Sequence, residues 1–303
     1  MNPAIRVLPV FLVICVGWCG RRVGLLPPAF CAPANRVTYW LAVPCLIFLK
    51  ISAAPFREVF RPGWILAALV AIAVVWAAAM ALAPLLGLRG GSRGTFAQAS
   101  VHANLGYVGL AVAYYALGDP GLQVAGVFAA FFMLANNVLS VVALATTAGT
   151  RVSPGLLARR IVLQPVILGS LTGLMWSWYQ LPMPSLIGET IRILGSMALP
   201  LALLLIGADL GVRALRHPAP ALTALGLKNL VLPALGCALL TLAGAGGLPR
   251  AAAVVLLAAP SATLTLIMGR EMGGDTALAS TSISLSTFAS AITLPLWLWL
   301  LGG

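Results

Sequence analysis

The sequence predicts an all-α polytopic membrane protein with ten transmembrane helices, arranged as two inverted five-helix repeats with broken, crossing helices four and nine. Three observations lead to this prediction: the apolar composition, ten long apolar stretches and an internal repeat. Of the 303 residues, 61% are hydrophobic and only 8% are charged, whereas a soluble domain is about 45–50% apolar and about 25% charged. The composition therefore excludes a soluble enzyme and a disordered chain.

The basic character of the chain does not indicate a nucleic-acid partner. Lys and Arg number 18 against 6 Asp and Glu, which gives a net charge of +12. These cations lie singly or in pairs between apolar stretches, without a run of five or more. Such placement is typical of loop ends in membrane proteins. The expected environment is therefore a lipid bilayer, with no nucleic acid bound.

Ten apolar stretches approach the length of about 20 residues that a membrane-spanning helix needs. They cover approximately residues 4–20, 37–54, 63–88, 94–117, 121–145, 161–179, 187–208, 219–244, 250–272 and 278–301. The first ends in Gly20-Arg21-Arg22 and not in a small-residue cleavage site, so we interpret it as a membrane helix instead of a signal peptide. The fourth is unusually polar and the ninth contains Pro260, so both are expected to break inside the bilayer.

An internal repeat divides the chain into residues 1–150 and 151–303. A shift of 156 residues, the separation of Pro9 and Pro165, aligns the halves without a gap. The same shift pairs Gly17 with Gly173, Pro44 with Pro200, and Gly118-Asp119 with Gly274-Asp275. Because each copy has five spans, an odd number, the second copy enters the membrane in the inverted orientation, as in many secondary transporters. In that design the corresponding helices four and nine meet near the midplane.

The loop cations predict that both termini lie outside the cytoplasmic membrane. With that orientation the cytoplasmic side carries eleven cations, namely Arg21, Arg22, Arg36, Arg89, Arg93, Arg151, Arg159, Arg160, Arg213, Arg216 and Arg270. The outer side carries six, namely Arg6, Lys50, Arg57, Arg61, Arg192 and Arg250. An excess of cations on the cytoplasmic side is the usual arrangement.

The two expected helix breaks are the candidate solute-binding segments. The first runs from Asn104 to Gly109 and includes Gly106 and Tyr107, and the second runs from Ala259 to Thr263 and includes Pro260 and Ser261. The N-terminal ends of the helices that follow carry partial positive charge, which suits an anion. The alternative for either segment is close helix packing through small residues.

Other polar residues inside the predicted spans are secondary candidates. Asn136 and Asn137 are expected either to line a solute pathway, with Asn137 the better candidate, or to hold the bundle together. Lys228 either pairs with a substrate carboxylate, exchanges a proton, or extends to the membrane interface. For His102, a role in packing is favoured over a role as a proton relay. Asp209 is expected to form an ion pair with Arg213 in preference to carrying a proton. Ser286, Ser290 and Thr293 share one helical face and can be structural. Asp119 and Asp275 are expected to cap the helices that follow them.

Enzyme and cofactor motifs do not occur in the sequence. There is no Walker A loop, HExxH, DDxxD or Gly-x-Ser-x-Gly, and two histidines with five cysteines that lack a CxxC give no metal constellation. We therefore expect no enzymatic activity, no cofactor, no metal site and no direct coupling to ATP.

Several short phrases occur in a characteristic order along the chain. They are Leu8-Pro9-Val10-Phe11, Tyr39-Trp40-Leu41-Ala42-Val43-Pro44, Ala103-Asn104-Leu105-Gly106-Tyr107-Val108-Gly109-Leu110, Ala198-Leu199-Pro200-Leu201-Ala202-Leu203, Ala259-Pro260-Ser261 with Gly273-Gly274-Asp275, and Thr293-Leu294-Pro295-Leu296. Over nearly the whole chain, this order resembles the auxin efflux carrier family in its bacterial permease branch. The fourth span departs from the family pattern, because it has glycines where relatives commonly have a proline.

The resemblance implies a scaffold of helices one, two, six and seven and a moving transport unit of helices three to five and eight to ten. It also implies transport of small organic acids and a homodimer formed through the scaffold. The expected function is a permease that moves a small organic anion, such as a dicarboxylate, by alternating access. Protons or sodium are the candidate coupling ions, and the lack of clustered intramembrane carboxylates favours protons or uncoupled flux. The alternatives are a channel and, less favoured, a membrane-embedded lipid enzyme.

Overall fold

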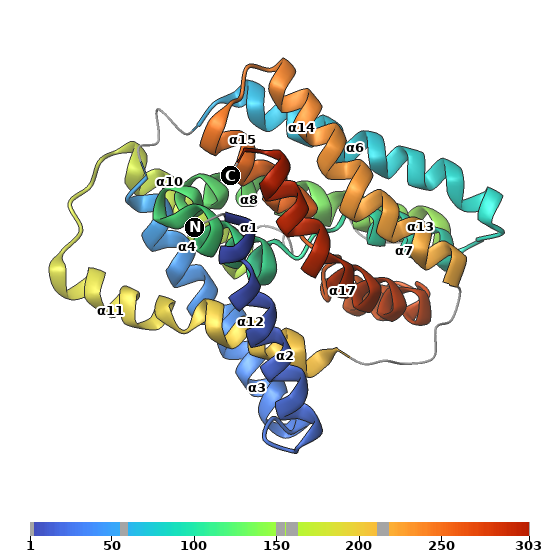
Figure 1. The fold of residues 1–303 in the computed structure, drawn as a ribbon, viewed down its shortest axis with the longest axis horizontal. Helices are drawn as coiled ribbons and strands as arrows, with labels where there is room; N and C mark the ends of the chain where they lie inside the picture. Colours follow the sequence, from blue (N-terminus) through green and yellow to red (C-terminus); the bar gives the residue numbers. More distant parts are fainter. Residues whose placement is uncertain (1–2, 55–59, 150–154, 156–162, 211–217, 303) are drawn as a thin grey trace.

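The computed structural model is all-helical over the residues that it describes, which are 3–54, 60–149, 155, 163–210 and 218–302 (Figure 1). The first half contains α1 (Pro3–Arg6), α2 (Leu8–Arg22), α3 (Pro28–Val37), η1 (Thr38–Ala42), α4 (Val43–Ser52), α6 (Pro62–Leu82), η2 (Ala83–Leu86), α7 (Gly91–Val101), η3 (Leu105–Gly109) and α8 (Leu110–Ala148). The second half contains α10 (Pro165–Trp178), α11 (Ser185–Ser196), α12 (Ala198–Asp209), α13 (Pro218–Gly226), η4 (Leu227–Val231), α14 (Leu232–Leu242), α15 (Gly247–Ala258), α16 (Leu264–Glu271) and α17 (Thr276–Leu300). The predicted all-α class is confirmed for these residues.

Five continuous helical stretches in the described part are long and apolar enough to cross a membrane. They are Pro62–Leu86, Leu105–Ala148, Ser185–Asp209, Pro218–Leu242 and Thr276–Leu300. Leu105–Ala148 joins two predicted spans, and its kink is at Gly118, where φ is 71°. Glycine adopts this left-handed conformation without the steric cost that a side chain adds.

Several helix boundaries differ by a few residues or more from the sequence-based expectation. The second predicted span, 37–54, is preceded by helix from Pro28, because prolines fit the first turn of a helix. Helix α7 begins at Gly91, ahead of the expected residue 94. Of the cations used to predict the orientation, Arg57, Arg151, Arg159, Arg160, Arg213 and Arg216 lie outside the described residues.

The helices pack into two neighbouring groups. In one, α2 runs along α12, and α4 packs against α10 and α11. In the other, α6, α7, α8, α14, α15 and α17 contact one another, with α14 and α6 side by side along one edge of the molecule (Figure 1). Helix α8 also contacts α4 and α10, so it joins the two groups.

The contact between α2 and α12 depends on two glycines. A Cβ atom added to Gly17 would overlap the Leu204 carbonyl oxygen, and one added to Gly207 would overlap the Ile14 carbonyl oxygen. Each glycine therefore lies directly against the backbone of the other helix, which is the close approach that small residues allow in membranes.

We expect Gly207→Val to destabilise the protein, because its side chain must push α12 away from Ile14. Overpacking of this kind costs about 1–3 kcal/mol or more. The matched control is Gly63→Val, since a Cβ added to Gly63 meets nothing within 4 Å. Thermal melting of the purified proteins tests this, and equal melting temperatures for the two variants contradict the close-approach assignment.

Candidate functional site

Two helices are interrupted at the centre of the molecule, and their interruptions are bonded to each other. Helix α7 ends at Val101 and the chain resumes as helix at Leu105, whereas α15 ends at Ala258 and α16 begins at Leu264. Ala103 and Ser261 form an isolated antiparallel β-bridge. The Asn104 N–H donates to the Pro260 carbonyl at 2.7 Å, and the Ala262 N–H donates to the His102 carbonyl at 2.8 Å. Backbone groups that the breaks release are thus paired across the gap, as an apolar environment requires.

The carbonyl ends of the two half-helices are satisfied by side chains. The Ser261 hydroxyl donates to the Ala99 carbonyl in the last turn of α7 at 2.7 Å. The Lys228 ammonium donates to the Leu257 carbonyl in the last turn of α15 at 2.5 Å. The Ser261 N–H, which an uninterrupted helix would direct to Leu257, donates instead to the Ser286 hydroxyl at 3.0 Å. Both C-terminal ends are therefore closed by protein groups.

The N-terminal ends of the helices that follow the breaks remain uncapped. Neither Asn104 at the start of η3 nor Thr263 at the start of α16 makes a side-chain capping bond. The N–H groups of Gly106 and Tyr107 in one helix, and of Thr263 and Leu264 in the other, have no acceptor among the described residues. Uncapped first-turn N–H groups carry partial positive charge and suit an anion.

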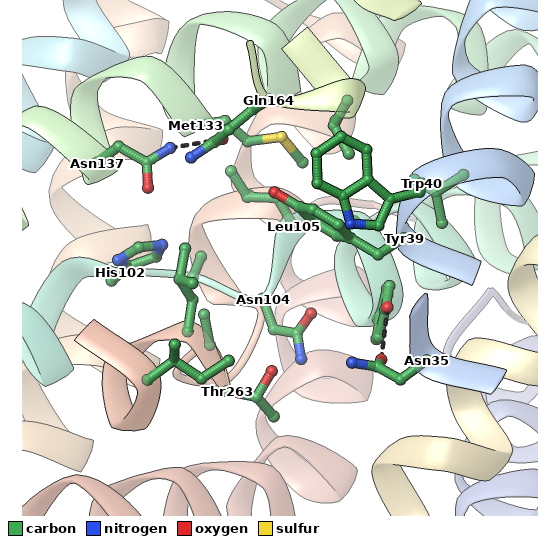
Figure 2. Close-up of a pocket in the computed structure, with 18 of the residues that line it drawn as sticks. Asn35, Tyr39, Trp40, His102, Asn104, Leu105, Met133, Asn137, Gln164 and Thr263 are labelled. Atoms are coloured by element: carbon green, nitrogen blue, oxygen red, sulfur yellow. Dashed lines mark hydrogen bonds between the residues drawn. The ribbon is translucent and has the colours of Figure 1, made fainter. Parts of the chain in front are cut away.

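These uncapped ends line a single cavity of about 350 Å³. Figure 2 shows the Asn104 amide directed toward Asn35 and Thr263. The Tyr107 hydroxyl donates to Asn35 Oδ1 at 2.7 Å, which ties α3 to the start of η3. On the other side of the cavity, Asn137 Nδ2 donates to Gln164 Oε1 at 2.9 Å (Figure 2). The cavity thus combines amides and a hydroxyl with an apolar wall, the usual composition of a small-molecule site.

A second cavity, of about 530 Å³, adjoins the first and shares Asn35, Asn104 and Thr263 with it. Three arginines line it, namely Arg21, Arg22 and Arg270, against the single carboxylate Asp209. The Arg22 guanidinium lies 4.2 Å from the centre of the Trp18 ring, which holds it in the wall. The three arginines therefore make this cavity, beside the uncapped helix ends, electrostatically favourable for an anion.

The predicted site residues separate into two sets. Asn104, Gly106, Tyr107, Asn137 and Thr263 line the first cavity. Pro260, Ser261 and Lys228 do not line it, and their polar groups hold the interruption together instead. The Lys228 side chain is 0% exposed, so it does not extend to the membrane interface.

The remaining polar predictions have mixed outcomes. Asp275 caps α17 as expected, accepting from the N–H groups of Ala277 and Leu278. Asp119 forms an ion pair with Lys50 in place of the expected cap. His102 lines the cavity and its Nδ1 lies 2.9 Å from the Ser140 hydroxyl. The expected Asp209 partner, Arg213, lies outside the described residues.

The hydroxyls on one face of α17 form hydrogen bonds within the protein, and Asn136 is buried away from both cavities. Ser286 accepts from Ser261, Ser290 donates to the Thr287 carbonyl at 2.7 Å, and Thr293 accepts from Asn229. Asn136 is buried outside the lining of either cavity. Ser286 and Thr293 therefore link α17 to neighbouring segments, whereas Ser290 bonds within its own helix; both are the structural roles that the sequence left open.

Sequence reasoning missed three polar residues of the cavity, which are Asn35, Arg36 and Gln164. Asn35 and Arg36 directly precede the predicted span 37–54, outside any predicted helix. Gln164 is an amide near the start of the predicted span 161–179, and that polarity was an available signal.

Comparisons with known proteins match the chain to membrane transport proteins. A family model described as membrane transport protein matches residues 4–149 and 135–298. A Rhizobium meliloti protein named "Putative malonate transporter" is 28% identical, with 97% of this chain and 94% of the relative covered. Uncharacterized transporters from Methanocaldococcus jannaschii (28% identical, 99% of each chain) and Methanothermobacter thermautotrophicus (26% identical, 98% of each chain) are also similar.

Proposed function

The chain belongs to the auxin efflux carrier family of membrane transport proteins, and we propose that it moves a small organic anion, such as a dicarboxylate, across the cytoplasmic membrane by alternating access. The observation that carries this proposal is the meeting of two uncapped helix N-termini at one cavity. Each end supplies a set of N–H donors to one carboxylate group of the solute, and no fixed counter-ion has to be displaced first.

The cavity chemistry supports a short dicarboxylate over a large or apolar solute. Its volume of about 350 Å³ is near the lower end for ligand sites. Amide groups of Asn104 and Asn137 can contact carboxylate oxygens, while the arginine-lined second cavity attracts anions toward the site. The name of the Rhizobium meliloti relative points to malonate, the substrate with which we would begin.

The alternating-access part of the proposal rests on the two packing groups. We propose that α1, α2, α3, η1, α4, α10, α11 and α12 form the scaffold, and that the remaining helices form the moving transport unit. The pairing of α2 with α12 and of α4 with α10 supports this division. The two breaks also occupy corresponding positions in the 156-residue register, since Asn104 aligns with Pro260. Ten spans in inverted repeats, termini outside and a scaffold-mediated homodimer belong to the same proposal.

The test of anion binding is thermal melting of the purified protein with matched charged and neutral ligands. We expect malonate and succinate to raise the melting temperature, whereas malonamide and succinamide leave it unchanged. A ligand present at about 100 times its dissociation constant stabilises the folded state by about 2.7 kcal/mol. Equal stabilisation by the neutral diamides contradicts anion recognition by the helix ends.

A further inference from the structure

Lys228 places its amino group deep inside the helix bundle, without a carboxylate partner among the described residues. It lies in the π-helical segment η4, and its side chain is 0% exposed. No carboxylate of the described residues is within ion-pair distance of its ammonium; Asp119 pairs with Lys50 and Glu189 with Arg192. Burying an unpaired charge in a membrane protein is costly, so a residue of this kind calls for a functional explanation.

The ammonium has a specific acceptor because of the nearby helix break. Leu257 lies in the last turn of α15, and its carbonyl has lost the helical donor Ser261, whose N–H goes to Ser286. The Lys228 ammonium donates to this carbonyl at 2.5 Å. The C-terminal end of a helix carries partial negative charge, so a cation is electrostatically favoured there.

Carbonyl groups at the C-terminal end of a broken helix are also the groups that bind coupling cations in secondary transporters. On this basis we propose that the Lys228 ammonium permanently occupies the coupling-cation position of this protein, so that a tethered charge replaces sodium. The inference rests on the proposed transport function, and it adds that transport proceeds without a sodium requirement. It also assigns Lys228 to the transport unit as a positioning residue for α15 and not as a substrate ligand.

The variant that tests this idea is Lys228→Ala, which leaves an empty space beside the Leu257 carbonyl. We expect sodium or methylammonium chloride to raise the melting temperature of this variant by several degrees relative to choline chloride at equal ionic strength. Lys228→Met fills the same space with an apolar chain, so it is expected to show no such response. Lys50→Ala is the matched control, because Lys50 is the other lysine of the chain and pairs with Asp119 away from the break.

The unmodified protein provides a second measurement, which does not depend on whether the variants fold. We expect its melting temperature to be the same in sodium, potassium and choline chloride, and its malonate uptake in proteoliposomes to change less than twofold when sodium is replaced by potassium. Sodium-specific stabilisation, or uptake that rises with an inward sodium gradient, overturns the inference. A folded Lys228→Ala protein that responds to neither small cation also overturns it. The melting experiments contain no substrate, so a failure of the proposed transport function is detected separately, as a lack of response to carboxylates.

Discussion

Replacing Asn104 with aspartate is expected to lower dicarboxylate uptake at least 100-fold. Asn104 directly precedes η3, and its amide is directed into the cavity (Figure 2), which Gly106 and Tyr107 with their uncapped N–H groups also line. A carboxylate at this position competes with the substrate for these donors and repels it. Two unit charges about 4 Å apart repel by about 4 kcal/mol at an effective dielectric constant of about 20, and every 1.4 kcal/mol is about tenfold in affinity.

The Asn104→Asp variant is expected to fold, because an acidic residue at a helix N-terminus is favourable. Its melting temperature without ligand is therefore the first control. Asn104→Ala provides the second, since it removes the amide without adding charge and is expected to lose about tenfold in affinity. Uptake by Asn104→Asp within threefold of the unmodified protein contradicts the position of the anion between the helix ends.

The second large effect is expected from Asn137, for which the chain supplies its own control. Asn137 lines the cavity and donates to Gln164, whereas the adjacent Asn136 is buried outside the cavity lining. Asn137→Ala removes a contact to the solute and leaves Gln164 without its donor, which costs about 1–3 kcal/mol. We expect the Michaelis constant for malonate to rise about tenfold to a hundredfold in this variant.

Asn136→Ala is expected to change protein stability more than the Michaelis constant. Initial rates of uptake over a range of malonate concentrations, together with melting temperatures, separate the two outcomes. If both alanine variants raise the Michaelis constant equally, Asn137 acts through the packing of α8 and not through the solute.

The second interruption was predictable because its cause is local in the sequence: Pro260 lacks an N–H, and the break lies at the predicted residues 259–263. The first was predicted at Asn104–Gly109, but the structure breaks the helix at residues 102–104, and Gly106 and Gly109 lie in the helical segment η3 that follows. The all-helical class follows in the same way from composition. By contrast, the start of the second helix at Pro28 was missed, because Pro33 and Arg36 within it resemble loop residues in a hydropathy pattern.

The partners inside the site could not be predicted, because they depend on packing between distant helices. Gln164 meets Asn137 and Asn35 meets Tyr107 only after α3, α8 and α10 come together. Similarly, the sequence identifies Lys228 as an intramembrane cation but does not indicate that its acceptor is the Leu257 carbonyl. Pro260 and Ser261 were correctly associated with the break, yet their polar groups serve its internal bonding and not the cavity.

Counterflow in proteoliposomes tests the central claim most directly, because it requires a saturable site that is exposed alternately on the two sides of the membrane. Vesicles containing the purified protein are loaded with excess unlabelled malonate and diluted into a trace of labelled malonate. The account predicts a transient accumulation of label above its equilibrium level, abolished by Asn104→Asp and preserved without sodium. Label that only approaches equilibrium, at a rate that does not saturate with malonate concentration, would contradict transport by alternating access.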